Sequence, residues 1–240
     1  QPITSNQFSI GYFRNFFDNQ LEASVELYYK DMQNVISYKE GTQYMPSDEN
    51  WQDKIASGKG WSYGLEFMAE KEWEHTNLSV AYTLSWTYRQ FDEINNGKLY
   101  PYKYDRRHDI NISLTHEFND RIDMGINWIY ATGNAFTVPF EMYYGAGDPF
   151  SGDYGYQDQV TYFKNRNNYR APAYHRLDVG VNFHKQKKWG ERTWMLSVFN
   201  AYGRYNPVFM IVENDYENGL ELYQVTLFRF VPSITYRFKF

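Results

Sequence analysis

Histidine and acidic side chains are the residues of this 240-residue sequence that could carry acid–base or metal chemistry. There are five His and no Cys, so disulfides and thiolate metal sites are excluded. The histidines are dispersed, without the spacing of a zinc site or a catalytic set. His108 and Asp109, at a strand start, form one candidate metal or acid–base pair, and the alternative is an ordinary hydrogen bond at the rim. We therefore predict that the protein is not an enzyme and uses no metal or cofactor.

The densest run of charge is DRRHD at residues 105–109. Arginine pairs well with phosphate, so the run could bind the phosphates of lipopolysaccharide. It could instead brace the end of a sheet through ion pairs. We favour the structural interpretation.

Tyrosines interleaved with glycines mark the stretch 134–172 as a candidate binding loop. Tyrosine presents an apolar face and a polar tip at low entropic cost, which suits capture of a sugar, peptide or siderophore. The alternative is that these aromatic loop residues pack on one another. The candidate ligand contacts in this loop and its neighbours are Tyr143, Tyr144, Tyr154, Tyr156, Trp51, Tyr100 and Tyr102.

The composition indicates elements that can position such loops. The sequence has 24 Tyr, 18 Phe and 7 Trp, yet its mean hydropathy is −0.71. Many aromatics in a polar chain indicate alternation of apolar and polar residues. The net charge of −5 gives no basic excess, so no nucleic-acid partner is predicted. No stretch of about 18 apolar residues occurs, which excludes a membrane-spanning helix.

Alternation with a period of two runs along nearly the whole chain and predicts strands. In residues 78–88, for example, apolar side chains occupy every even position. Several predicted strands reach a dozen residues, whereas a tilted membrane strand needs about 9–11 and soluble strands average about 5–6. The nine predicted strands are 6–17, 20–38, 61–73, 77–91, 106–118, 121–133, 173–185, 192–213 and 221–240.

The connections between these strands alternate strictly between short and long. Long connections are predicted at 39–60, 92–105, 134–172 and 214–220, and tight turns lie between them. A membrane barrel with short turns at one rim and long loops at the other has this pattern. The fold class predicted is therefore all-β, an antiparallel transmembrane β-barrel in an outer membrane.

Aromatic residues on the apolar parity fall near the ends of the predicted strands, as expected at the two interfaces of a bilayer. The final residue, Phe240, ends an alternating strand and resembles the signal that outer-membrane assembly machinery reads. The aromatics predicted at the interface beside the long loops are Tyr29, Trp86, Tyr88, Trp128 and Tyr130.

Nine strands cannot close a barrel without leaving open edges in lipid, and bacterial single-chain barrels have even counts. We therefore expect further strands before Gln1. The chain also begins without Met or a signal peptide, as a processed chain or a fragment would.

Four segments resemble the barrel of TonB-dependent receptors from the Bacteroidetes. They occur in the order expected for the family, and each contributes to one predicted strand or its flank. The segments are GWSYGLEF at 60–67, LYPYKYDRRHD at 99–109, FNAYGRYNP at 199–207 and FVPSITYRFKF at 230–240.

The resemblance implies a 22-stranded barrel with an N-terminal plug, of which residues 1–240 would be the C-terminal part. It implies a receptor that imports a nutrient with energy supplied through TonB, which would act on the absent N-terminal region. Outer-membrane lipid, lipopolysaccharide and a surface lipoprotein lid are further expected partners. Two other classes stay open: a porin or adhesin without a plug, and a soluble aromatic-rich module that binds carbohydrate.

Overall fold

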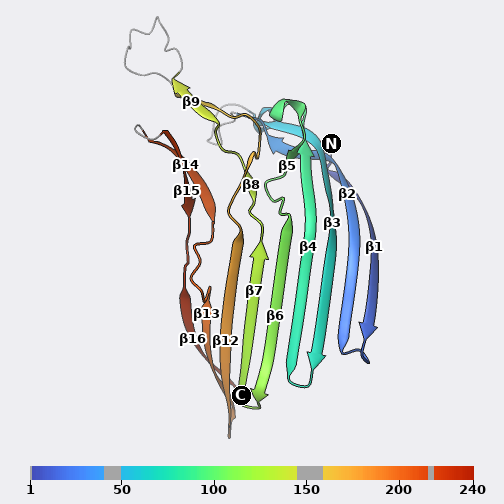
Figure 1. Ribbon diagram of the computed structural model, residues 1–240, viewed down its shortest axis with the longest axis vertical. Helices are drawn as coiled ribbons and strands as arrows, with labels where there is room; N and C mark the ends of the chain where they lie inside the picture. The colour runs from blue at the N-terminus through green and yellow to red at the C-terminus, as the bar shows by residue number, and fades with distance from the viewer. Residues whose placement is uncertain (1, 41–49, 145–158, 216–218) are drawn as a thin grey trace, which may run out of the picture.

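The computed structural model describes residues 2–40, 50–144, 159–215 and 219–240. Its main feature is one large antiparallel sheet in which nine long strands lie side by side (Figure 1). These strands are β1 (Thr4–Phe16), β2 (Leu21–Tyr38), β3 (Ile55–Trp73), β4 (Thr76–Gln90), β6 (His108–Asn119), β7 (Ile122–Ala131), β12 (Tyr174–Lys187), β13 (Gly190–Phe199) and β16 (Val231–Lys239).

The short elements all lie in the long connections. A two-residue strand, β5, pairs with β4, and three further strand pairs stand apart from the main sheet. The short elements are β5 (Tyr100–Pro101), β8 (Ala135–Phe136), β9 (Glu141–Tyr144), β10 (Gln159–Tyr162), β11 (Tyr169–Arg170), β14 (Phe209–Asp215), β15 (Gly219–Val225), and the 3-10 helices η1 (Trp51–Lys54) and η2 (Asn95–Gly97). Among the described residues, no helix combines the length and the apolarity that crossing a membrane requires.

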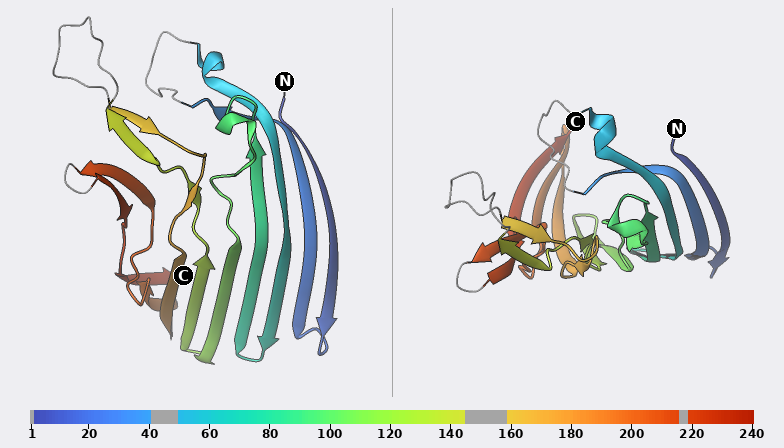
Figure 2. Two further views of the ribbon diagram at one scale, coloured as in Figure 1. Left: turned by 45° about the horizontal axis from the view of Figure 1, so that its top comes forward. Right: turned by 90° about the horizontal axis from the view of Figure 1, so that it is seen from above.

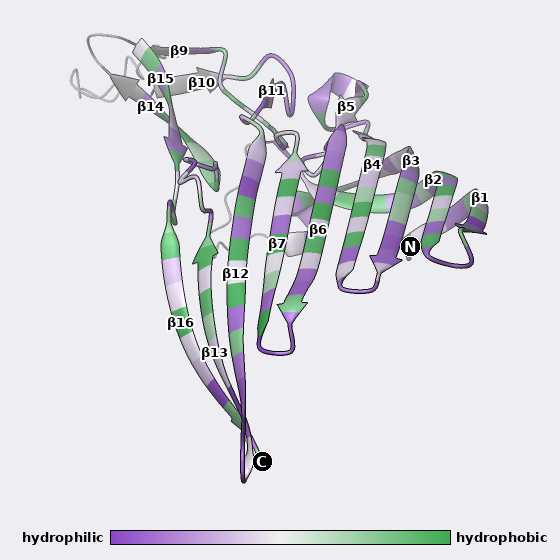
Figure 3. Ribbon diagram, turned by 60° about the horizontal axis from the view of Figure 1, so that its bottom comes forward, coloured by the Kyte–Doolittle hydropathy of each residue, from purple (hydrophilic) through white to green (hydrophobic). Residues whose placement is uncertain are grey.

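One face of the sheet is apolar across all of its strands, and we call it the apolar face. The register places apolar side chains of successive strands opposite each other, so the alternation within each strand becomes continuous rows across the sheet. Figure 3 shows the resulting bands of hydrophobic and hydrophilic residues. One such row runs through Tyr12, Val25, Phe67, Tyr82, Ile110 and Tyr130.

The opposite face, which we call the polar face, carries the intervening positions. It places Glu26 opposite Glu66, and Ser113 opposite Asn127. Ser113 Oγ donates a 2.8 Å hydrogen bond to Asn127 Oδ1, so this face forms its own polar contacts. A sheet with one apolar and one hydrogen-bonding face suits a lipid boundary on one side and water or protein on the other.

Seen from above, the sheet is an open arc rather than a closed ring (Figure 2). Its edge strands are β1 and β16, the first and last long strands of the chain. The expected nine barrel strands are therefore all present, and the arc they form is part of a barrel wall.

The connections separate the two ends of the sheet. Residues 17–20, 74–75, 120–121 and 188–189 form short turns at one end, which we call the turn rim. Residues 39–54, 91–107, 132–173 and 200–230 form long connections at the other end, which we call the loop rim. The predicted alternation of short and long connections is confirmed.

Glycine is required at one of the short turns. Gly190 has φ of 151°, and a Cβ on it would lie 2.1 Å from the carbonyl oxygen of Lys239. The close approach of β16 to this turn thus leaves no room for a side chain.

The prediction for the last two strands was wrong in its bounds. The segments 192–213 and 221–240 are each divided, because the chain leaves the sheet between β13 and β16 to form the separate hairpin β14–β15. Asn200 and Gly203 adopt φ of 54° and 64°, which ends β13. The Asn200 side chain is fully buried and donates to the carbonyl oxygens of Arg204 and Arg229, which closes the excursion. Pro207 accordingly lies in this connection and not within a strand.

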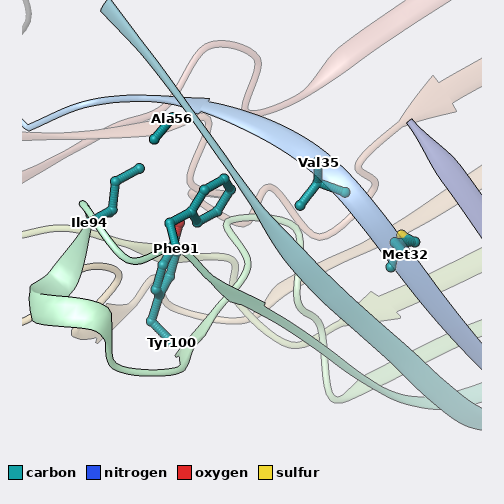
Figure 4. Packing of buried hydrophobic residues seen from close by; sticks show 6 residues of the cluster. All are labelled: Met32, Val35, Ala56, Phe91, Ile94 and Tyr100. Atoms are coloured by element: carbon teal, nitrogen blue, oxygen red, sulfur yellow. The ribbon is translucent and has the colours of Figure 1, made fainter. Parts of the chain in front are cut away.

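The buried apolar cluster lies at the loop rim, not in the middle of the sheet (Figure 4). Most large apolar side chains of the sheet are instead partly or largely exposed, with Ile10 at 74% and Leu27 at 52%. Neither face of the wall is covered by a second layer in the described residues, so its apolar side chains have no protein core to fill. The cluster comprises Met32, Val35, Ala56, Phe91, Ile94 and Tyr100.

Candidate functional site

The loop rim gathers most of the polar contacts between distant segments, and Asp105 is at the centre of one group. Its side chain is fully buried and pairs with Arg107, at 3.3 Å, and with Arg170. The backbone N–H of Thr87 also donates to its carboxylate at 2.6 Å. A buried carboxylate is costly unless it is paired and hydrogen-bonded, and Asp105 has both kinds of partner.

Arg170 connects two of the long connections. Besides the ion pair, its Nη1 donates to the carbonyl oxygen of Asp105 at 2.7 Å and to that of Gly133 at 3.4 Å. The β4–β6 connection is thereby tied to the part of the β7–β12 connection that leaves β7 and to the part that returns to β12. The sequence pattern did not predict this role, because Arg170 lies 65 residues beyond Asp105.

The two arginines of the charged run hold neighbouring strands. The Arg107 guanidinium lies 4.5 Å above the ring of Trp86 and donates to the carbonyl oxygen of Ser85 at 2.7 Å. Arg106 Nε donates to Asn134 Oδ1 at 2.8 Å, and Arg106 Nη1 lies 3.6 Å from Asp109. These contacts support the structural interpretation of residues 105–109.

A second tie is made by Arg166. Its backbone N–H donates to Asn95 Oδ1 at 2.8 Å, and its guanidinium donates to Ser37 Oγ at 3.3 Å and to the carbonyl oxygen of Tyr38 at 3.4 Å. The guanidinium also lies 5.8 Å from the centre of the Tyr100 ring. The return limb of the β7–β12 connection therefore crosses the ends of β2 and β4 and is fixed there by charge-assisted bonds.

The seven predicted ligand contacts lie in different surroundings. Tyr100 is only 4% exposed and stacks on Phe91 with ring centres 6.3 Å apart. Burial raises the pKa of its hydroxyl. Its ring is part of the buried cluster in this arrangement and does not face a binding surface.

Trp51 and Tyr102 are more accessible. Trp51 lies on η1 and is 65% exposed. Tyr102 is half-buried between the guanidinium of Arg89, 4.4 Å from its ring centre, and the ring of Tyr104, at 5.4 Å. These contacts fix the Tyr102 ring while leaving part of it at the surface.

The remaining candidates belong to the connection between β7 and β12. The backbone of Tyr143 and Tyr144 pairs with β10 as part of β9. Tyr154 and Tyr156 lie outside the described residues. Ligand contact by any of the seven residues stays a prediction.

The predicted interface aromatics lie on the apolar face. Tyr29 pairs in register with Tyr63, which pairs with Trp86, and the Tyr63 and Trp86 rings stack at 5.4 Å. Tyr88 is the next residue on the same face toward the loop rim, and its ring centre lies 6.5 Å from that of Tyr63. On β7, Trp128 and Tyr130 stack at 6.1 Å.

Four of the five histidines form side-chain hydrogen bonds. His108 Nδ1 lies 2.9 Å from the hydroxyl of Tyr82, which matches the interpretation of a hydrogen bond at a strand start. Near the turn rim, His184 lies between two carboxylates, with Nε2 2.5 Å from Asp123 and Nδ1 3.1 Å from Glu191. Opposite ring nitrogens face these two acids, so they cannot converge on one ion. Within the described ranges, no group of three or more such side chains could hold a metal ion.

A cavity of about 460 Å³ opens at the loop rim between three connections. It lies where the segment that enters β14 approaches β8 and the start of β12 (Figure 1). Its walls include Phe136, Tyr174 and Phe209, and its charged groups are Lys103 and Arg106. The sequence prediction missed this cavity, since residues from three separate connections form it.

Fold and loop rim together define a class of protein: part of the wall of an outer-membrane β-barrel, with long connections braced at one rim. Residues 1–201 match the family described as "TonB dependent receptor-like, beta-barrel". The chain therefore belongs to the TonB-dependent receptor β-barrel family, whose members are receptors of the bacterial outer membrane, and that is where this protein is located.

Solved structures of similar fold agree with this assignment. The FrpB iron transporter from Neisseria meningitidis is 15% identical, with a TM-score of 0.54 over 84% of this chain and 27% of its own. The ferripyoverdine receptor of Pseudomonas aeruginosa is 12% identical, with a TM-score of 0.53 over 93% and 26%. The ferric citrate transporter FecA is 13% identical, with a TM-score of 0.55 over 95% and 30%. The chain thus spans less than a third of each of these receptors. No curated protein matches its sequence.

Proposed function

We propose that the protein is a TonB-dependent receptor that imports a nutrient across the outer membrane with energy supplied through TonB. Ligand would bind at the loop rim, and rearrangement of a plug would then admit it. Membership of the receptor barrel family is the observation that carries the proposal. The long connections at one rim, tied by Asp105 and Arg166, supply a preorganised surface for binding.

Residues 1–240 would form the C-terminal part of a 22-stranded barrel that encloses a plug. The open arc of nine strands supports this proposal, because its free edges would be costly in lipid and must pair with further strands. The share of the solved receptors that the chain spans, between 26% and 30%, also supports it.

The partners in this proposal follow from the two faces and the two rims. The apolar face would contact outer-membrane lipid and lipopolysaccharide. TonB would act through the N-terminal region, and a surface lipoprotein lid would cover the loop rim. The four segments that resemble Bacteroidetes receptors support an origin in that phylum.

The substrate class proposed is a glycan, peptide, siderophore or similar nutrient. Three of the solved structures are an iron transporter, a ferripyoverdine receptor and a ferric citrate transporter. Sequence identities of 12–15% support a shared fold and not a shared substrate. A ferric siderophore is therefore one class among those to be tested. Trp51 and Tyr102 are the described aromatics proposed to contact it.

Energy coupling is tested with a strain that carries the whole receptor and a strain from which it is deleted. Both are grown in competition on panels of sole iron, carbon and nitrogen sources, with and without functional TonB. We expect the receptor to give an advantage on one or more sources, and the advantage to vanish without TonB. An advantage that persists without TonB would contradict the proposal.

The same protein in a planar bilayer separates a plugged receptor from a porin. A plugged barrel blocks its lumen, so we expect no stable conductance. A steady open channel would instead support a barrel without a plug.

A further inference from the structure

The cavity at the loop rim has walls that are mainly aromatic and aliphatic. Phe136, Tyr174 and Phe209 contribute rings, and Pro172, Val208 and Met210 contribute aliphatic or thioether surface. A volume of about 460 Å³ is within the range that encloses a small organic molecule. The walls thus favour a ligand with an apolar or aromatic body.

Three separate connections contribute these walls. Lys103 and Arg106 come from the β4–β6 connection, Phe136 of β8 and Tyr174 at the start of β12 come from the β7–β12 connection, and Phe209 begins β14 in the connection between β13 and β16. The β4–β6 and β7–β12 connections are anchored to each other beside the cavity. Arg106 Nε donates to Asn134, and Arg170 donates to the carbonyl oxygens of Asp105 and Gly133. Both anchors lie against cavity residues, so this part of the wall is held in place before any ligand arrives.

The charge around the cavity has one sign. Lys103 and Arg106 are the charged residues among its described lining, and no carboxylate is among them. Asp105 does not line the cavity, because its side chain is fully buried between Arg107 and Arg170. Asp109 approaches Arg106 only to 3.6 Å, and 41% of the Arg106 side chain is exposed. The positive charge of Lys103 and Arg106 at the cavity is therefore only partly neutralised by neighbouring carboxylates.

We propose that this cavity binds a small amphipathic anion, whose acidic group lies against Lys103 and Arg106 and whose apolar or aromatic body packs on Phe136, Tyr174 and Phe209. Arginine and lysine form charge-assisted hydrogen bonds with carboxylates or phosphates, and the aromatic walls exclude water from the body of the ligand. The inference names a substrate class for the proposed receptor and so rests on that function, but binding itself requires neither TonB nor transport.

The test uses three probes of nearly equal shape that differ in charge: 2-naphthoate, 2-naphthamide and 2-naphthylmethylamine. Binding to the whole receptor in detergent is followed by saturation-transfer NMR and by calorimetry. We expect the anion to bind about tenfold more tightly than the neutral amide, with the cation weaker still. The advantage of the anion should shrink as salt is raised.

Two substitutions assign binding to this cavity. Lys103→Gln removes one charge from an exposed loop residue, and we expect it to weaken naphthoate binding about tenfold with little change for the amide. Val208→Asp places a carboxylate in the wall at a position that is 54% exposed, and it should weaken the anion further. Lys98→Gln, at an exposed lysine outside the lining, is the matched control and should change nothing.

Equal affinity for the three probes would overturn the inference, as would naphthoate binding that Lys103→Gln and Val208→Asp leave unchanged. The TonB growth competition is independent of these outcomes. Selective binding without TonB-dependent growth would contradict the proposed function alone. TonB-dependent growth without selective binding would contradict this inference alone.

Discussion

Arg170 and Asp105 form an ion pair that joins two long connections, with the carboxylate fully buried and the guanidinium side chain 38% exposed. Arg107 shares the same carboxylate, and Thr87 donates its backbone N–H to it. The pair turns a run of charged residues into a brace for the loop rim. Binding surfaces carried on long loops need such anchoring, because ordering a loop during binding costs free energy.

Replacing Asp105 with Ala should loosen the loop rim. Two arginines and one backbone N–H would lose their acceptor, and we expect a loss of about 2 kcal/mol, less than for a fully buried pair because Arg170 is partly solvated. Samples are heated to graded temperatures before electrophoresis, and the temperature at which the folded barrel converts to the unfolded band is measured. Trypsin cleavage after Arg166 and Arg170 gives a second measure of the loosening.

Glu93→Gln is the matched control for this prediction. Glu93 pairs with Lys39 at 2.6 Å, but its side chain is 59% exposed. Its loss should leave thermal stability and trypsin cleavage as in the parent. Equal effects of the two substitutions would show that Asp105 does not brace the rim.

Gly64 should not tolerate a side chain. A Cβ there would lie 2.5 Å from the carbonyl oxygen of Leu84 and 2.9 Å from the hydroxyl of Tyr28, which covers the glycine from the neighbouring strand. We expect Gly64→Ala to cost about 1–3 kcal/mol. Gly125, with nothing within 4 Å of a Cβ, is the control, and Gly125→Ala should have little effect on the fraction of folded barrel in membranes.

The two faces of the wall can be distinguished by placing one charge on each. Val80 lies on the apolar face and Ala81, its neighbour, on the polar face of β4. We expect Val80→Arg to destabilise the barrel by about 2–4 kcal/mol in a bilayer, because arginine would face lipid, whereas Ala81→Arg should be tolerated. Refolding into lipid vesicles at graded urea concentrations measures the unfolding free energy of both variants. A larger loss of stability for Ala81→Arg than for Val80→Arg would place lipid on the polar face.

Much of this wall could be predicted from the sequence, because the alternation of residues such as those of β4 is a local property. The number and order of the nine long strands and the sequence of short and long connections were predicted correctly, although β3 begins at Ile55 and not at residue 61. The strand bounds failed after Phe199, where the apolar run Val208–Val212 continues a strand-like pattern. The turn that separates the two segments depends on the buried contacts of Asn200 with Arg229, which alternation does not encode.

The loop rim was predicted less well, because the surroundings of a loop residue depend on distant segments. Residues 105–109 were recognised as a possible brace, yet the main partner, Arg170, lies in another connection. Tyr100 was a candidate for ligand contact, but it packs on Phe91 and approaches Arg166. Periodicity predicts which face of the sheet a strand residue occupies. No comparable sequence pattern predicts the surroundings of a residue in an irregular loop.

Two of the predicted ligand contacts should behave differently when truncated. Tyr100→Ala would remove a buried ring from the cluster at the loop rim and should destabilise the barrel by about 3 kcal/mol. Trp51→Ala, at a residue that is 65% exposed, should leave stability unchanged. Thermal unfolding of both variants checks this expectation. A stability loss for Trp51→Ala as large as that for Tyr100→Ala would contradict these environments.

Phe240 is predicted to be an assembly signal, and its surroundings make a clean test possible. Its side chain is 99% exposed and lies beyond the last paired residue of β16, and its ring centre is 5.3 Å from that of Phe238 in an edge-to-face arrangement. Removing the ring should therefore cost the folded barrel little free energy while lowering the rate at which the assembly machinery inserts it. We expect Phe240→Ala to reduce the amount of receptor in the outer membrane several-fold at unchanged thermal stability. Lys239→Ala, one residue earlier, should change neither quantity, and normal surface levels of Phe240→Ala would show that the terminal ring is not the signal.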